Sequence, residues 1–170
     1  MLQGEGKARF IGVANCDVGQ LDRLCRIAPV TSLQLPYSLL GREIEDGVLS
    51  FCKSHRIGVL AYSSLHSGLL TGKMTPARIS ALPHNDWRRR SPSFQQPMLC
   101  HGLAVVDRLR AVGARKTHTP TEVAIAWTLH NPAITATSVG IRELHQVDEA
   151  VGAASVLLSA KDIEELAQEV

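Results

Sequence analysis

Hydrophobic residues gather in four short runs along the chain, each of strand length. Nearly every position within a run is apolar, which is typical of parallel strands covered on both faces. After each run, apolar positions recur every three or four residues, the spacing of a helix with one buried face. The pattern predicts an α/β protein in which strands and helices alternate. The predicted strands are residues 10–14, 31–35, 57–62 and 135–139.

Local signals mark where several helices begin. Asp17 precedes an apolar helical pattern and Gln20 follows three residues later, as in a capping box. Thr119 and Glu122 have the same spacing around a proline, which suits the first helical position. The predicted helices cover residues 18–28, 44–55, 99–115, 120–130, 144–154 and 159–166. The apolar face of the fifth consists of Leu144, Val147, Val151 and Ala154.

Alternating strands and helices form a parallel sheet with right-handed crossovers, and the loops at the carboxyl ends of the strands then carry the chemistry. The connection between the third and fourth strands is unusually long and contains a polar, proline-containing stretch at residues 74–97. Connections of that length are usually functional. No repeat or linker divides the chain, so residues 1–170 are predicted to form a single domain.

Composition and charge exclude several classes of protein. The 170 residues are 45% hydrophobic with a net charge of +2, which fits a globular protein and offers no basic field for nucleic acid. We find no apolar segment typical of a signal peptide or membrane span, and expect a cytoplasmic protein. The four scattered cysteines are predicted to be reduced core residues, and no histidine or cysteine spacing indicates a metal site. The chain is shorter than the roughly 200–250 residues of a closed eight-stranded α/β barrel.

Polar side chains lie at the carboxyl ends of the predicted strands. Asn15 and Gln34 each offer a donor and an acceptor, which suits an amide-bearing ring such as nicotinamide. Tyr62 offers a flat face on which such a ring could stack. Turn formation or pairing of a buried amide would also explain each of these residues without a ligand.

Two glycine-containing segments suit phosphate groups. Residues 67–73 combine two glycines, two hydroxyls and Lys73, although the spacing is not that of a P-loop. Gly140 and Arg142 precede a predicted helix, where backbone amides and a guanidinium could meet a second phosphate. Gln146 and Glu149 follow at helical spacing and either reach an adenosine or are simply solvated.

Five segments in order resemble the aldo-keto reductase family. They are GKARFIGVAN at residues 6–15, LQLPYSLL at 33–40, YSSLHSGLLTGK at 62–73, DWRRR at 86–90, and the Gly140-Ile141-Arg142 turn with Gln146 and Glu149. The resemblance covers strands five to eight of that family. It therefore implies half of a TIM (β/α)8 barrel, with about four parallel strands and flanking helices, and an oxidoreductase that uses NADP(H).

By this resemblance, Asn15 and Gln34 hold the carboxamide of the cofactor and Tyr62 stacks on its nicotinamide. A second group lines the pyrophosphate and a third lies at the adenosine and its 2′-phosphate. The pyrophosphate group is Ser63, Leu65, Ser67, Gly68, Leu69 and Lys73. The adenosine group is Gly140, Arg142, Gln146 and Glu149.

The chain departs from the family pattern at four positions, which predicts weaker binding of NADP(H). They are Ala14, Ser64, His66 and Ala150. His66 is either a substitute proton donor, because histidine titrates near neutrality, or a solvated loop residue. The arginines at residues 88–90 form a solvated loop or supply one contact to the cofactor.

The resemblance places the catalytic Asp, Tyr, Lys and His of the family in the half of the barrel that this chain does not match. No residue here is therefore predicted to be catalytic, and we expect a reductase fragment that is not competent alone. The alternative is a non-catalytic module that binds nucleotide or a partner protein. Four strands would expose two sheet edges, so a homodimer or larger assembly is expected to cover them.

Overall fold

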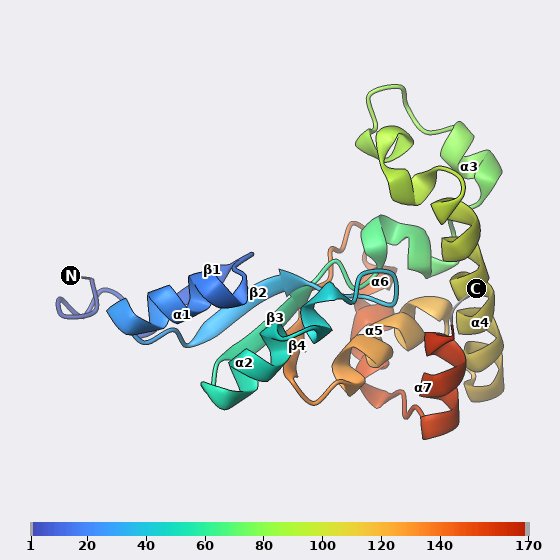
Figure 1. The fold of residues 1–170 in the computed structure, drawn as a ribbon. Helices are drawn as coiled ribbons and strands as arrows, with labels where there is room; N and C mark the ends of the chain where they lie inside the picture. Colours follow the sequence, from blue (N-terminus) through green and yellow to red (C-terminus); the bar gives the residue numbers. More distant parts are fainter. Residues whose placement is uncertain (1, 169–170) are drawn as a thin grey trace.

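The computed structural model describes residues 2–168 and contains one parallel four-stranded sheet with the strands in the order β1-β2-β3-β4 (Figure 1). The prediction of four parallel strands is confirmed, although three are shorter than their hydrophobic runs and β2 is shifted by one residue. Each strand in the interior of the sheet pairs with its neighbours in sequence. The strands are β1 (Gly12–Ala14), β2 (Ser32–Pro36), β3 (Gly58–Tyr62) and β4 (Ile134–Thr137).

Seven α-helices flank the sheet or extend from it in the described residues. The predicted helix at 120–130 is found with those bounds, and both expected capping boxes form, at Asp17 and at Thr119. The helix expected at 44–55 is broken, because Gly47 with a φ of 92° separates a 3₁₀ turn from a shorter helix. The helices are α1 (Val18–Ile27), α2 (Val48–Ser54), α3 (Pro76–Ser80), α4 (Met98–Lys116), α5 (Pro120–His130), α6 (His145–Gly152) and α7 (Ala160–Ala167).

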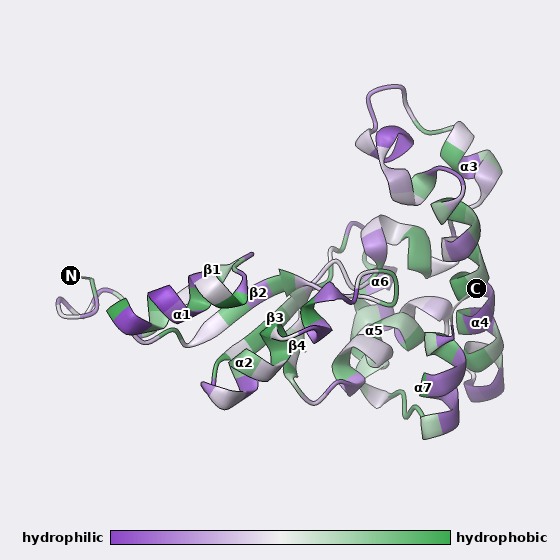
Figure 2. Ribbon diagram, in the orientation of Figure 1, coloured by the Kyte–Doolittle hydropathy of each residue, from purple (hydrophilic) through white to green (hydrophobic). Residues whose placement is uncertain are grey.

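One face of the sheet packs against helices and the other is open. Alternate strand residues such as Leu33 and Val59 are fully buried and share a core with Leu21 of α1 and Trp127 of α5. Their neighbours point the opposite way, and Leu60 is 37% exposed. Figure 2 shows hydrophobic residues along β2 and β3 and hydrophilic residues on the outer side of α4 and α7. The sheet is therefore a layer with a single covered face, as expected of half a barrel.

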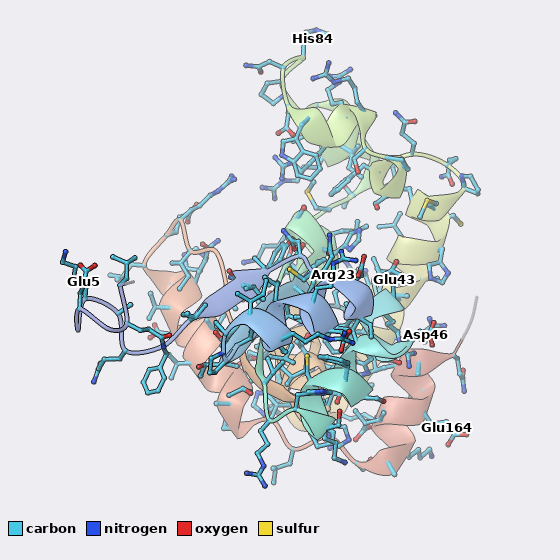
Figure 3. All side chains as sticks on the ribbon, turned by 60° about the vertical axis from the view of Figure 1, so that its left-hand side comes forward. Glu5, Arg23, Glu43, Asp46, His84 and Glu164 are labelled. Carbon is cyan, nitrogen blue, oxygen red and sulfur yellow. The ribbon has the colours of Figure 1, made fainter. Side chains whose placement is uncertain are left out.

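The long connection after β3 has a small core of its own. It contains α3 and two 3₁₀ turns, Trp87–Arg90 and Pro92–Phe94. Phe94 and Ile79 pack there with Leu69 and with Leu99 of α4. Figure 1 shows this connection standing above the helices, and His84 lies at its far tip (Figure 3).

The apolar face of α6 is not buried, which the sequence pattern alone does not reveal. Leu144 is 87% exposed, Val151 is 69% exposed and Val147 is 38% exposed. The helix ends at Gly152 and continues as a 3₁₀ turn that includes Ala154, which is also exposed. No other element of the described chain covers this face of α6.

The four cysteines are free thiols, as expected, but only one is fully in the core. Cys52 is buried, Cys16 and Cys25 are half-buried, and Cys100 is exposed on α4. The expectation of core cysteines is therefore wrong for Cys100.

Asp162 joins the terminal helix to α4. Its carboxylate accepts hydrogen bonds from the Ser159 backbone and hydroxyl and lies 3.3 Å from Arg115 and 3.1 Å from Lys116. These contacts, the Ser159 hydroxyl foremost, hold the pKa of Asp162 well below its usual range. The charged form of the carboxylate is therefore favoured in the folded state.

Replacing Asp162 with asparagine is expected to cost about 1 kcal/mol of stability at neutral pH, because it weakens a helix cap and two ion pairs. A lowered pKa stabilises the fold above the ordinary aspartate pKa of about 4, and that stabilisation is lost as the pH falls. The difference between wild type and Asp162→Asn should therefore shrink towards about pH 3. Urea unfolding at both pH values measures it, and a difference that does not change with pH would contradict the assignment.

Candidate functional site

A cavity of about 880 Å³ lies at the carboxyl ends of β3 and β4. Clefts of this size hold drug-sized ligands and cofactors. Loops after both strands form its walls, and the long connection closes one side. Ten of the thirteen predicted site residues line it: Tyr62, Ser63, Leu65, Ser67, Gly68, Lys73, Gly140, Arg142, Gln146 and Glu149.

The loop after β3 has an unusual backbone. Ser63, His66, Ser67 and Gly68 all have positive φ angles, from 45° to 92°. Turns that contain left-handed residues present backbone N–H groups to a common concavity, and such concavities bind anions. A Cβ placed on Gly68 would meet no atom within 4 Å, so the loop is open towards the cavity there. This backbone suits phosphate.

The turn after β4 is held by a side chain of α6. The backbone N–H groups of Arg142 and Glu143 both donate to Oε1 of Gln146, at 2.7 and 3.2 Å. Gln146 therefore shapes the turn from within, in addition to lining the cavity. The Arg142 guanidinium has no hydrogen-bond or ion-pair partner among the described residues, so it is free to pair with a ligand.

An ion pair spans the mouth of the cavity. Lys73 Nζ, from the loop after β3, lies 3.5 Å from Oε2 of Glu149 on α6. Glu149 is the more buried of the two side chains. The structure thus brings these two predicted site residues together across the gap between the loops.

The arginine run is more structured than a solvated loop. Arg88 donates to both oxygens of Asp86, at 3.0 and 2.6 Å, and lines the cavity. Hydrogen bonds from Arg88 lower the pKa of Asp86 to about 2, so this carboxylate is charged at neutral pH. Arg89 donates to the carbonyl of Leu82, and only Arg90 is exposed. The first two arginines therefore hold the connection in shape beside the cavity.

Three predicted residues do not line the cavity. Asn15 follows β1 and accepts a hydrogen bond of 3.0 Å from the hydroxyl of Tyr62, and Gln34 lies in the middle of β2 opposite Ala14. The backbone N–H of Asn15 also donates to the backbone carbonyl of Gln34 at 2.9 Å. Leu69 is fully buried, with its side chain so close to Gly102 of α4 that an added Cβ there would lie 2.8 Å away. Only the backbone of Leu69 is left for a ligand.

His66 is neither solvated nor in the cavity lining. It is half-buried, with Nε2 lying 2.9 Å from the Ser93 hydroxyl and Nδ1 3.4 Å from the Ser38 hydroxyl. Burial lowers its pKa, and Glu43 opposes this only in part. His66 is thus neutral at pH 7 and ties the loop after β3 to the long connection, which argues against a role as proton donor.

Two hydroxyls that the sequence did not single out as ligand contacts line the cavity. Ser64 and Thr121 are 1% and 5% exposed, and neither hydroxyl has a hydrogen-bond partner among residues 2–168. Buried polar groups normally have partners, so these two hydroxyls are unpaired polar groups in the wall of the cavity. Thr121 also lies in the first turn of α5, where the helix end favours negative charge. No signal in the sequence marks either hydroxyl as unpaired.

The charge of the cavity favours an anion. Four cationic side chains line it against two acidic ones, namely Lys73, Arg78, Arg88 and Arg142 against Asp86 and Glu149. Because Lys73 and Arg88 already pair with the two acids, the surplus lies on Arg78 and Arg142. The residues present therefore fit a ligand that carries phosphate groups.

A second cavity of about 500 Å³ lies among α2, α5 and α7. On its wall, the Tyr37 hydroxyl donates to Glu45 at 2.6 Å, and Arg42 pairs with the same carboxylate. Burial raises the pKa of Tyr37, so its hydroxyl keeps its proton. Since these groups are already paired with each other, we assign no ligand here.

Two features are absent from residues 2–168, namely a metal-binding cluster and a membrane-spanning helix. No group of three or more histidine, cysteine or acidic side chains is placed to hold a metal ion. Among the same residues, no helix has the length and apolar character needed to cross a lipid bilayer.

Comparison with known proteins gives one consistent result. The sequence model of the aldo/keto reductase family matches residues 1–169. Probable aldo-keto reductase 1 from Glycine max is 29% identical over 169 residues, which are 99% of this chain and 48% of that protein. The chain thus spans about half the length of this curated relative.

Solved structures show the same half-length correspondence. A glycerol dehydrogenase from Gluconobacter oxydans is 31% identical, with a TM-score of 0.88 over 97% of this chain and 50% of its own. A thermostable aldo-keto reductase is 22% identical, with a TM-score of 0.69 over 98% and 50%, which shows the fold alone. The four-stranded sheet therefore corresponds to half of a TIM barrel.

Proposed function

Because this chain belongs to the aldo/keto reductase family, we propose that it binds NADP(H) in the cavity at the ends of β3 and β4 and does not reduce carbonyl compounds by itself. The observation that carries the proposal is the surplus of positive charge among the described residues that line this cavity. In this family NADP(H) supplies the hydride for carbonyl reduction.

Different residues of the cavity would bind different parts of the cofactor. The left-handed loop at residues 63–68 and Lys73 would hold the pyrophosphate, and the unpaired Arg142 would pair with the 2′-phosphate. Tyr62 would offer its ring to the nicotinamide. Its hydroxyl is bound to Asn15, so the ring is oriented before any ligand arrives.

The same residues offer no proton donor for a carbonyl oxygen. The Tyr62 hydroxyl is bound to Asn15, and the Tyr37 hydroxyl is bound to Glu45 in the other cavity. His66 is held by two serines away from the cavity lining. General acid catalysis contributes about 10²–10⁴ in rate, so reduction by these residues alone would be slow.

A non-catalytic nucleotide-binding or protein-interaction module is the second candidate. The exposed apolar face of α6 favours it, because large exposed apolar patches commonly mark interfaces.

We also propose a cytoplasmic location, since the four free cysteines suit a reducing compartment.

Titration of the protein with NADPH, followed by the fluorescence of the reduced nicotinamide, tests the proposal. We expect saturable binding that is tighter for NADPH than for NADH, because only NADPH carries the 2′-phosphate that Arg142 would pair with. Absence of saturable binding for either cofactor would refute the site.

A further inference from the structure

The sheet has a free edge at each end. Among the described strands, β1 pairs only with β2, and β4 pairs only with β3. Unpaired edges present backbone donors and acceptors that can pair with another chain. The helix that follows β1 in the chain is α1, and the helix that follows β4 is α6.

The exposed face of α6 combines apolar side chains with one free acid. Leu144, Val147 and Val151 recur at the spacing of one helical face and are all exposed. Asp148 lies on the same face, four residues after Leu144 and three before Val151, and is exposed. It has no ion-pair or hydrogen-bond partner among residues 2–168. The opposite side of α6 is the one that contacts α5 and the cavity.

The outer side of α1 carries the complementary pair. Val18 faces α2, because it is the side chain that a Cβ on Gly47 would contact. Arg23 and Ile27 lie on the other side of the helix, four residues apart, and Ile27 is 78% exposed. Arg23 is exposed (Figure 3) and lacks a partner within the described residues. This side of α1 therefore faces away from α2.

We propose that two copies of this chain pair about a twofold axis, with α6 of each copy against α1 of the other. Leu144 and Val151 would then cover Ile27, and Asp148 would meet Arg23. In the same arrangement β4 of each copy pairs in parallel with β1 of the other, which closes eight strands into a barrel.

A second copy is the occupant that the two surfaces favour. The α6 surface combines three exposed apolar residues with an acid, and the α1 surface combines one, Ile27, with a base. Neither charged side chain has a partner among residues 2–168, so each surface complements the other and not itself. One twofold axis would form both α6–α1 contacts at the same time and would leave no edge strand unpaired.

The cofactor site is incomplete without the second copy. Gln34, Leu60 and Tyr62 lie on the open face of the sheet, where the nicotinamide would have water on its outer side. In the dimer the second sheet supplies the opposite wall and encloses that face. The enclosure of the nicotinamide rests on the proposed function, whereas the formation of the dimer does not.

The oligomeric state tests the proposal in the absence of cofactor, so its failure is distinct from failure of NADP(H) binding. Size-exclusion chromatography with light scattering should give twice the chain mass of 18.4 kDa. The double variant Leu144→Glu/Val151→Glu should elute as a monomer. Its circular dichroism should be unchanged, because both side chains are exposed in the single chain. Met98→Glu, at an exposed apolar residue of α4, is the control and should remain dimeric.

A charge exchange tests the register of the two helices. Arg23→Asp and Asp148→Arg should each weaken dimerisation about fivefold to tenfold, and the two substitutions together should restore most of the loss. A monomeric wild type would overturn the proposal. So would a dimer that the α6 double variant leaves intact, or a chain that associates only with a different half-barrel.

Discussion

Gly113→Ala is expected to lower the free energy of unfolding by about 2 kcal/mol, although alanine favours a helix interior over glycine. The cause is close packing at the junction of α4 and α5, where a Cβ on Gly113 would clash with the carbonyl oxygen of His118. That oxygen cannot move freely. The His118 N–H donates to the Gly113 carbonyl at 3.0 Å, and Thr119 begins the capping box of α5.

Gly19→Ala provides the matched control for this substitution. Gly19 is also in a helix, but its Cβ would meet only Asp17 at 3.4 Å, an ordinary contact. That variant should be as stable as wild type or gain up to about 1 kcal/mol from helix propensity. Urea unfolding of the three proteins decides the matter, and equal stability of the two variants would show that the junction tolerates a methyl group.

Arg142→Glu is expected to weaken NADPH binding by about tenfold to a hundredfold. The Arg142 guanidinium has no hydrogen-bond or ion-pair partner among residues 2–168 and lies in the turn that precedes α6, so it is placed to pair with a phosphate. Reversing its charge removes that pair and adds repulsion. NADH lacks the 2′-phosphate, so its binding should change little.

Arg90→Glu is the control for charge, because it changes the net charge of the protein equally. Arg90 is exposed, lies outside the cavity lining and lacks a partner among residues 2–168. It should leave the affinity for NADPH within about twofold of wild type at moderate salt, where distant charges are screened. Equal losses from both variants would mean that Arg142 acts only through the general field of the protein.

The elements that could be predicted from the sequence are those whose boundaries are set by interactions between neighbouring residues. Thr119 and Glu122 define the start of α5 through a reciprocal cap, which needs no tertiary contact. The break before α2 comes from the backbone of Gly47, which an apolar pattern does not report. The face of α6 was correctly read as apolar, but whether it is covered depends on elements beyond the helix.

In the cavity, too, the order of the elements predicts some residues, whereas others depend on tertiary contacts. Tyr62 ends β3 and Gly140 follows β4, and parallel strands end at one edge of a sheet, so their grouping is predicted by the order of the elements. The side chain of Leu69 is buried in the core by the 3₁₀ turn, so its predicted contact with the cofactor falls to its backbone. The hydroxyl of Thr121 became a candidate only when its burial and lack of a partner were visible. His66 is held by Ser93, a contact between distant residues that no local pattern reveals.

The central claim is that this chain holds NADP(H) without reducing a carbonyl compound. The direct measurement is the fluorescence of NADPH mixed with excess wild-type protein, followed before and after addition of an aldehyde. We expect the signal to change on binding and then to stay constant when the aldehyde is added. Rapid aldehyde-dependent loss of NADPH that Arg142→Glu abolishes would contradict the claim.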